Sequence, residues 1–107
     1  MIYELRIYHM HAGKMPAIHQ RFSEVTLNLF RKHGMTVCDF WEDAEGNAKL
    51  YYILEHADRA SRDTQFKAFE NDPNWIQAKE RSEEDGPIVE KLENYFMKRA
   101  PYSPLNH

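Results

Sequence analysis

Two histidines separated by one residue, His9 and His11, are the first residues in the chain whose spacing could hold a metal ion. On an extended strand, residues two apart share a face, so both imidazoles could approach one ion. A tetrahedral site needs at least one more ligand, usually a carboxylate or histidine nearby, and the sequence indicates none. Gly13 follows and is typical of a turn. We therefore predict a strand end that enters a turn, and no metal.

Other residues could bind a ligand through aromatic contact or a titratable group. His33 precedes Gly34 at the expected end of a helix, where it either compensates the helix dipole or exchanges a proton at a pocket rim. Aromatic side chains suit a core, and they equally suit an apolar pocket with a few polar groups. No nucleophile–base pair, phosphate loop or paired-carboxylate motif identifies a catalytic residue. The ligand-binding candidates are Tyr8, His33, Trp41, Tyr52, Phe66 and Trp75.

The composition restricts the class of protein. A chain of 107 residues with 42% hydrophobic content suits a single globular domain over residues 1–107. The net charge of −3, with acidic and basic residues interspersed, provides no electrostatic basis for binding nucleic acid. No apolar run approaches the roughly 18 residues of a membrane span. The one cysteine, Cys38, fits a reducing compartment, which predicts a cytoplasmic location, and its strand-like neighbours predict a buried side chain.

The spacing of apolar residues and breakers predicts the elements. Apolar spacings of three and four predict a helix from Pro16 to a left-handed stop at Gly34. Asp58 and Asp72 are expected to cap two further helices. The segment 88–99 fits a helix or a strand, and its aromatic residues favour a strand from about Leu92. The other expected strands are residues 2–9, 35–43 and 49–56, and the proline-containing tail 100–107 is expected to form neither strand nor helix.

This order of elements predicts an α+β fold, the ferredoxin-like split βαβ arrangement with helices on one face of a four-stranded antiparallel sheet. On the first strand, Tyr3, Leu5 and Ile7 alternate with a mixed set of polar residues. We expect the mixed set on the uncovered face, where a second copy would bury it in a homodimer. Arg6, once buried, would need a carboxylate such as Glu4. The dimer-interface candidates are Glu4, Arg6 and Tyr8.

Several blocks, in order along the chain, resemble a known family. They are MIYELRIY, GKM, LFRKHG, FW, FENDPNW and DGPIVEKLENYFMKRAPYSPL. The set resembles the NIPSNAP family, within the dimeric α/β-barrel superfamily, nearly from end to end. The resemblance implies a ferredoxin-like protomer whose sheet packs against a second copy. Haem-degrading members of the superfamily use a histidine on the second helix, and residues 58–71 contain none, so no haem or other cofactor is expected.

Two functional hypotheses remain. In the first, the protein binds a small, largely apolar molecule or another protein without catalysing a reaction, which the missing catalytic motifs favour. In the second, it is a cofactor-independent monooxygenase or isomerase acting on a small aromatic or lipophilic compound, because enzymes of this fold can rely on the reactivity of the substrate. Either hypothesis places a ligand between sheet and helices, with His33 or Tyr8 at its polar end.

Overall fold

The computed structural model describes residues 1–104, and residues 105–107 of the predicted irregular tail lie outside the described residues. Among the described residues, no helix is long and apolar enough to cross a bilayer. Along the chain the strands and helices are β1 (Ile2–Met10), α1 (Met15–Arg21), a π-helical segment (Phe22–Thr26), α2 (Leu27–Lys32), β2 (Thr36–Glu42), β3 (Lys49–His56), α3 (Arg59–Glu70), α4 (Pro73–Ser82) and β4 (Val89–Met97).

The predicted helix boundaries and the final strand are confirmed. The Asp58 side chain accepts a hydrogen bond from the Ser61 backbone N–H at 2.7 Å, and Asp72 caps α4 with Pro73 in the first turn. The long first helix differs from the prediction because it is continuous but not uniformly α-helical. Its middle turn is π-helical, with the backbone N–H of Leu27 donating to the carbonyl of Phe22. A π-helical turn contains more residues than an α-helical turn, so the side chains that follow it face a different direction than a uniform α-helix would give them.

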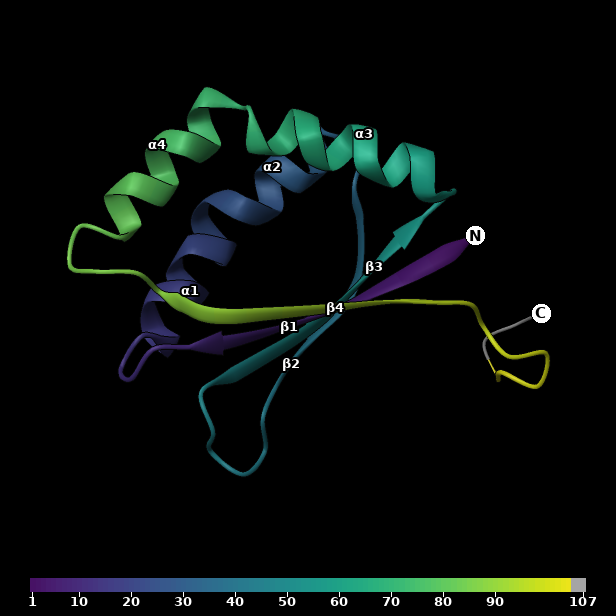
Figure 1. Ribbon diagram of the computed structural model, residues 1–107, viewed down its shortest axis with the longest axis horizontal. Helices are drawn as coiled ribbons and strands as arrows, with labels where there is room; N and C mark the ends of the chain where they lie inside the picture. The colour runs from purple at the N-terminus through teal and green to yellow at the C-terminus, as the bar shows by residue number, and fades with distance from the viewer. Residues whose placement is uncertain (105–107) are drawn as a thin grey trace.

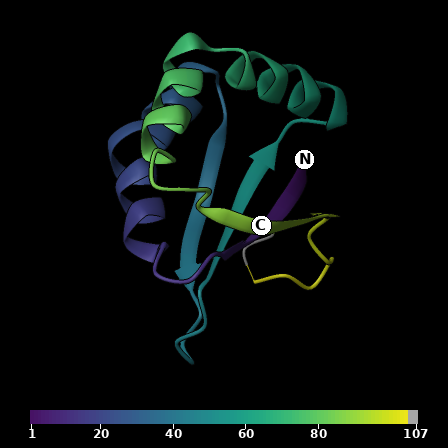
Figure 2. The same cartoon turned by 60° about the vertical axis from the view of Figure 1, so that its left-hand side comes forward.

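The sheet has the strand order β2-β3-β1-β4, with every neighbouring pair antiparallel. Figure 1 shows the helices together on one side of this sheet, and the turned view in Figure 2 shows the same layering. The arrangement confirms the predicted α+β, ferredoxin-like split βαβ fold. β1 is one of the two inner strands, with β3 and β4 as its neighbours, and side chains of these three strands meet beneath the helices.

The strand register decides which residues of β1 face the helices. Arg6 pairs with Tyr52 of β3 and Asn94 of β4, and directly paired residues share a sheet face. Glu4 is 0% exposed and Arg6 is 7% exposed, under the helices. Our prediction that Glu4, Arg6 and Tyr8 face the uncovered side is therefore wrong. It assumed that apolar residues mark the covered face, but charged groups that pair with one another can be buried there instead.

The uncovered sheet face carries the alternate residues, and it is more apolar than predicted. Tyr3, Leu5 and Ile7 lie on it and remain only half-buried in the single chain. Trp41 pairs with Tyr51 in register, so both share this face. Cys38 is also exposed, contrary to the prediction of a buried thiol. A bulge between Val37 and Asp39 interrupts the alternation there, so position in the strand no longer predicts the face.

The glycine stop after α2 provides a test of the fold. Gly34 has φ of +75°, and a Cβ built there would lie 3.3 Å from Nε2 of Gln65. Gly34→Ala should lower the free energy of unfolding by about 1–2 kcal/mol, because alanine is strained at positive φ. The loss should exceed that of a glycine without a close neighbour, because the new Cβ would also crowd Gln65. Gly46→Ala, at φ +84° with no atom within 4 Å, controls for backbone strain alone. Urea unfolding of both variants measures the difference, and a loss at Gly34 no larger than that at Gly46 would show that the Gln65 contact is unimportant.

Candidate functional site

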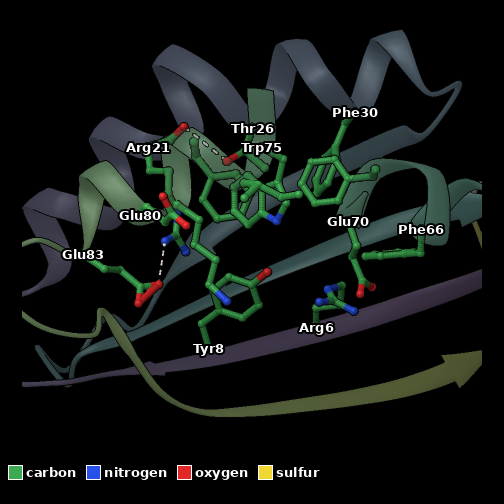
Figure 3. Close-up of a pocket in the computed structure, with 14 residues that line it drawn as sticks. Arg6, Tyr8, Arg21, Thr26, Phe30, Phe66, Glu70, Trp75, Glu80 and Glu83 are labelled. Atoms are coloured by element: carbon green, nitrogen blue, oxygen red, sulfur yellow. Dashed lines mark hydrogen bonds and ion pairs between the residues drawn. The ribbon is translucent and has the colours of Figure 1, made fainter. Parts of the chain in front are cut away.

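A cavity of about 760 Å³ lies between the sheet and the helices. Its floor comes from β1, and its walls come from the long first helix, α3 and α4 (Figure 3). The exposed residues Ile76, Lys79 and Glu80 of α4 stand at its mouth. The lining residues are Arg6, Tyr8, Arg21, Phe22, Thr26, Phe30, Phe66, Phe69, Glu70, Trp75, Ile76, Lys79, Glu80 and Glu83.

A hydrogen-bonded chain of three side chains forms the polar floor. Nε of Arg6 donates to the hydroxyl of Tyr52 at 2.6 Å, and the hydroxyls of Tyr52 and Tyr8 lie 2.8 Å apart. Because the Tyr52 hydroxyl accepts from Arg6, it can donate its own hydrogen bond to the Tyr8 oxygen, which leaves the Tyr8 hydroxyl free to donate to a ligand. Burial, together with the neighbouring Tyr8, raises the pKa of Tyr52, so this residue stays a neutral phenol. The cavity thus has a fixed donor at its floor.

A buried carboxylate beneath the cavity holds Arg6 in place. One oxygen of Glu4 accepts from Nη1 of Arg6 at 3.0 Å, Nη2 of Arg62 at 2.9 Å and Nδ2 of Asn94 at 3.0 Å. The other accepts from Nε2 of His56 and Nε of Arg62, each at 3.0 Å. Each partner lies on a different element, so the carboxylate joins β1, β3, β4 and α3. Of the carboxylates expected as partners for a buried Arg6, Glu4 is the one that binds it in the single chain.

The charges of this network perturb its pKa values in opposite directions. Burial alone would raise the pKa of Glu4, but hydrogen bonds from Arg62 and Asn94 and the two guanidinium charges lower it to about 2. Burial would lower the pKa of Arg6, yet its interactions with Tyr52, Tyr8 and Glu4 raise it above its ordinary value. Glu4 is therefore ionised and Arg6 charged at every physiological pH.

The walls of the cavity are aromatic. Phe66 packs between two guanidinium groups, with its ring centroid 4.7 Å from Cζ of Arg6 and 4.2 Å from Cζ of Arg62. Trp75 lies 4.7 Å, centroid to centroid, from Phe69 and 5.1 Å from Cζ of Arg21. These contacts hold the rings in place by stacking and cation–π attraction. The cavity can therefore enclose an apolar group between rings of defined orientation.

The π-helical segment positions a second arginine. Arg21, the last residue of α1, has a side chain that is 6% exposed, and its Nη1 donates to Ser82 and Glu83. Its Nε is buried without a hydrogen-bond partner among the described residues. The hydroxyl of Thr26 donates to the carbonyl of Arg21, five residues earlier, as the wider π-helical turn allows. The irregular turn thus places Arg21 and Thr26 together on the cavity wall.

Within residues 1–104, no group of three or more histidine, cysteine, aspartate or glutamate side chains is arranged to hold a metal ion. Nε2 of His9 donates to Oε2 of Glu93 at 2.6 Å, which is a diagonal contact between β1 and β4 because the register partner of His9 is Lys91. What the cavity can do chemically is bind an acceptor atom at its floor and an apolar body above it. A nucleophile paired with a general base is absent from its lining residues.

Comparison with known proteins identifies the family. The sequence profile of the NIPSNAP family matches residues 3–104. The chain belongs to the NIPSNAP family. No curated protein matches it in sequence.

Solved structures of NIPSNAP proteins share the fold. A NIPSNAP domain protein from Burkholderia xenovorans is 23% identical, with a TM-score of 0.83, over 97% of this chain and 99% of that one. A NIPSNAP family protein of unknown function from Agrobacterium tumefaciens is 23% identical, with a TM-score of 0.84, over 98% and 93%. A candidate antibiotic biosynthesis monooxygenase from Nitrosomonas europaea is 11% identical, with a TM-score of 0.64, over 92% and 98%. At these identities the likeness concerns the fold alone.

The NIPSNAP fold brings together only some of the predicted ligand-binding residues. Tyr8, Phe66 and Trp75 line the cavity, and Tyr52, which is 0% exposed, lies beneath it and bonds to Tyr8. Trp41 projects from the opposite sheet face. Two predicted residues, Trp41 and His33, do not line the cavity. The prediction for Trp41 rested on residue type alone, whereas that for His33 rested on its position at a helix end.

His33 joins two helix ends instead of lining the cavity. Its Nε2 lies 2.8 Å from Oδ2 of Asp72, and Nζ of Lys32 donates to the same oxygen at 2.7 Å. These hydrogen bonds from Lys32 and His33, with that from the backbone of Asn74, lower the pKa of Asp72. Asp72 also caps α4, so this contact fixes the end of α2 against the start of α4. Its role is therefore to position two walls of the cavity.

Several residues of the site were not predicted, and some signals for them exist in the sequence. His56 continues the alternation of Tyr52 and Leu54 on β3, so its face could have been predicted. Arg21 lies three residues after Ile18, within the expected apolar face of the helix. By contrast, Arg62 and Asn94 reach Glu4 from 58 and 90 residues away, and no local pattern indicates such contacts.

The buried carboxylate leads to a prediction about stability. Glu4 has a lower pKa in the folded NIPSNAP protein than its ordinary value of 4.5, so folding favours its ionised form. The resulting stabilisation, on the order of 3 kcal/mol, is present above about pH 4.5 and is lost as the pH falls toward 2. Glu4→Gln should lower the free energy of unfolding at pH 7 by roughly 3–5 kcal/mol, because two guanidinium groups lose their partner.

Urea unfolding between pH 2 and 7, at one protein concentration, measures both effects. Glu4→Gln should unfold with a shallower pH dependence below pH 4.5 than the unsubstituted protein. Glu45→Gln changes an exposed carboxylate, so it should change the free energy of unfolding by no more than a few tenths of a kcal/mol at each pH and leave its pH dependence as it was. A Glu4→Gln protein with unchanged stability and slope would contradict the role assigned to this carboxylate.

Proposed function

We propose that this protein binds a small, largely apolar molecule in the cavity between its sheet and helices, as a binding or interaction protein. The observation that carries the proposal is the chain from Arg6 through Tyr52 to Tyr8, which ends at an aromatic cavity. Ligand sites combine apolar walls with a few convergent polar groups in this way. A cavity of about 760 Å³ is also within the usual range for such ligands.

A second candidate function is that of a cofactor-independent monooxygenase or isomerase acting on a small aromatic or lipophilic compound. The same polar chain supports it, because donors aimed into an apolar cavity stabilise a developing oxyanion. The Nitrosomonas europaea protein of similar fold is named as a candidate antibiotic biosynthesis monooxygenase. If the protein, incubated in air with a compound that it binds, converts that compound catalytically into a product, the result would favour this function over binding alone.

We propose further that the protein acts as a homodimer joined through its uncovered sheet face. Exposed and half-buried apolar residues gather there, with Trp41 47% and Tyr95 51% exposed in the single chain. Leu5 pairs with Tyr95, so the patch extends to the sheet centre. A large apolar patch of this kind is rare on monomers, and packing two copies of the face is self-complementary.

The proposal also includes one domain over residues 1–107, which the shared core supports, as the sequence predicts. It places the protein in the cytoplasm, which the single cysteine supports.

A mouth-filling substitution tests ligand binding. Ile76 is 44% exposed and lines the cavity, so Ile76→Trp should fill its mouth without disturbing the core. We expect 2-naphthamide, an uncharged aromatic probe, to bind the unsubstituted protein and to bind this variant at least about tenfold more weakly. Isothermal titration calorimetry provides the measurement. Gln77→Trp adds the same ring at an exposed neighbour outside the lining and should bind as before. No binding of the probe by the unsubstituted protein at millimolar concentration would refute the proposal.

A charge on the uncovered face tests the dimer. Leu5→Asp would place an unpaired carboxylate in the proposed interface, where its desolvation is costly, but at the surface of a separate chain. Sedimentation equilibrium at low micromolar concentration should show a dimer for the unsubstituted protein and dissociation for Leu5→Asp. Gln77→Asp, on α4, should remain dimeric. A folded species of the 12.8 kDa chain mass for the unsubstituted protein would contradict the proposed assembly.

A further inference from the structure

We infer that the ligand of this cavity is an aromatic or otherwise apolar carboxylate, whose acidic head binds Arg6 at the cavity floor. The inference rests on the proposed binding function and names its ligand class. Three observations support it: an unfilled donor on Arg6, an excess of positive charge around Glu4, and an uncommitted carboxylate above the site.

The first observation concerns the donors of Arg6. Nε donates to Tyr52 and Nη1 donates to Glu4, while Nη2 has no hydrogen-bond partner among residues 1–104. The side chain is only 9% exposed, and the cavity is where it meets open space. A buried guanidinium is costly unless its donors are filled, and its planar fork matches a carboxylate. A carboxylate oxygen at this position would fill one of the remaining N–H donors of Arg6, and the Tyr8 hydroxyl lies on the same floor to bind its second oxygen.

The second observation is the charge balance beneath the floor. One carboxylate, Glu4, is shared between the guanidinium groups of Arg6 and Arg62. Arg62 also pairs with Asp63, which is at the same time held by Arg59. These ion pairs therefore contain three guanidinium groups and two carboxylates, so one positive charge is left over. The Arg59–Asp63 pair is exposed, but Arg6 and Arg62 are 9% and 16% exposed and share one buried carboxylate, so the positive charge at Arg6 attracts an anion more strongly than a surface charge would.

The third observation is Glu70. Figure 3 shows its carboxylate pointing toward Arg6 across the cavity, yet the two side chains form no ion pair within 4.0 Å. Glu70 is exposed at the end of α3, so its side chain can turn outward into water. Because its carboxylate points toward Arg6, Glu70 competes in the free protein for the place that a ligand anion would take. A ligand carboxylate would displace Glu70, and the competition lowers the affinity for the ligand.

The walls accommodate the remainder of such a ligand. Phe66 lies directly against Arg6, with Phe22 and Trp75 further along the lining. An aromatic acid would therefore place its ring among these side chains when its carboxylate meets Nη2.

A matched pair of probes tests the inference. 2-Naphthoate and 2-naphthamide share a ring and nearly the same shape, but only the first is charged. By isothermal titration calorimetry at pH 7 and low ionic strength, we expect the naphthoate to bind about tenfold or more tightly than the amide. Arg6→Lys retains a charge but removes the fork, and should reduce this ratio to near one.

Glu70→Gln provides a second arm that does not depend on the stability of the Arg6 variant. Removing the competing carboxylate should tighten naphthoate binding several-fold and leave amide binding unchanged. Glu80→Gln is the matched control, because it removes the same charge from an exposed residue at the cavity mouth, so its effect should be smaller.

The outcomes separate this inference from the proposed function. Equal affinities for the two probes, in both the unsubstituted protein and Glu70→Gln, would overturn the anionic ligand class and leave apolar binding intact. Equal tightening by Glu70→Gln and Glu80→Gln would show general electrostatics in place of a site at Arg6, and would also overturn it. Binding of neither probe at millimolar concentration would overturn the inference and the proposed function together.

Discussion

The carboxylate of Glu4 is the constraint on which the arrangement of the molecule depends. It is 0% exposed at the centre of the sheet, where an ionised group costs several kcal/mol unless its lone pairs are filled. The donors that fill them come from β1, β3, β4 and α3. Because the bonds to Arg62 are bidentate, α3 cannot slide along the sheet without breaking them. One side chain thus sets the height and register of the helix that forms a wall of the cavity.

The polarity of the cavity is a consequence of this network. Glu4 orients Arg6, Arg6 orients the Tyr52 hydroxyl, and Tyr52 in turn bonds to Tyr8 at the floor. The rings respond to the same charges, since Phe66 stacks between the guanidinium groups of Arg6 and Arg62. Structural and functional roles therefore coincide in these residues: the interactions that stabilise the covered sheet face also prepare a donor for a ligand. This is why a cavity without catalytic motifs still has a defined chemical preference.

Both faces of the sheet carry apolar residues, but the covered face also buries a network of charged groups. The covered face contains the charged network and a core that includes Tyr52 and Leu54, both 0% exposed. The uncovered face contains Leu5, Ile7 and their neighbours, which one chain leaves partly in water. In a typical half-exposed antiparallel sheet the apolar face is the covered one. Here the covered face is apolar as well, and the charged groups buried in it are stable only because they satisfy one another, while the uncovered face keeps an apolar surface suited to a second copy.

The sequence by itself determined the elements and their order, and thereby the fold class. The helix starts at Asp58 and Asp72 and the stop at Gly34 follow from local capping chemistry, which acts within a few residues and is therefore visible in the chain. Only the tertiary structure decided which face of β1 is covered, because Glu4 needs donors from His56, Arg62 and Asn94, which are 52, 58 and 90 residues away. The site followed that decision, so Tyr8 and Phe66 line the cavity while Trp41 does not. Alternation specifies that two faces exist, but the energy of long-range pairing selects which one is buried.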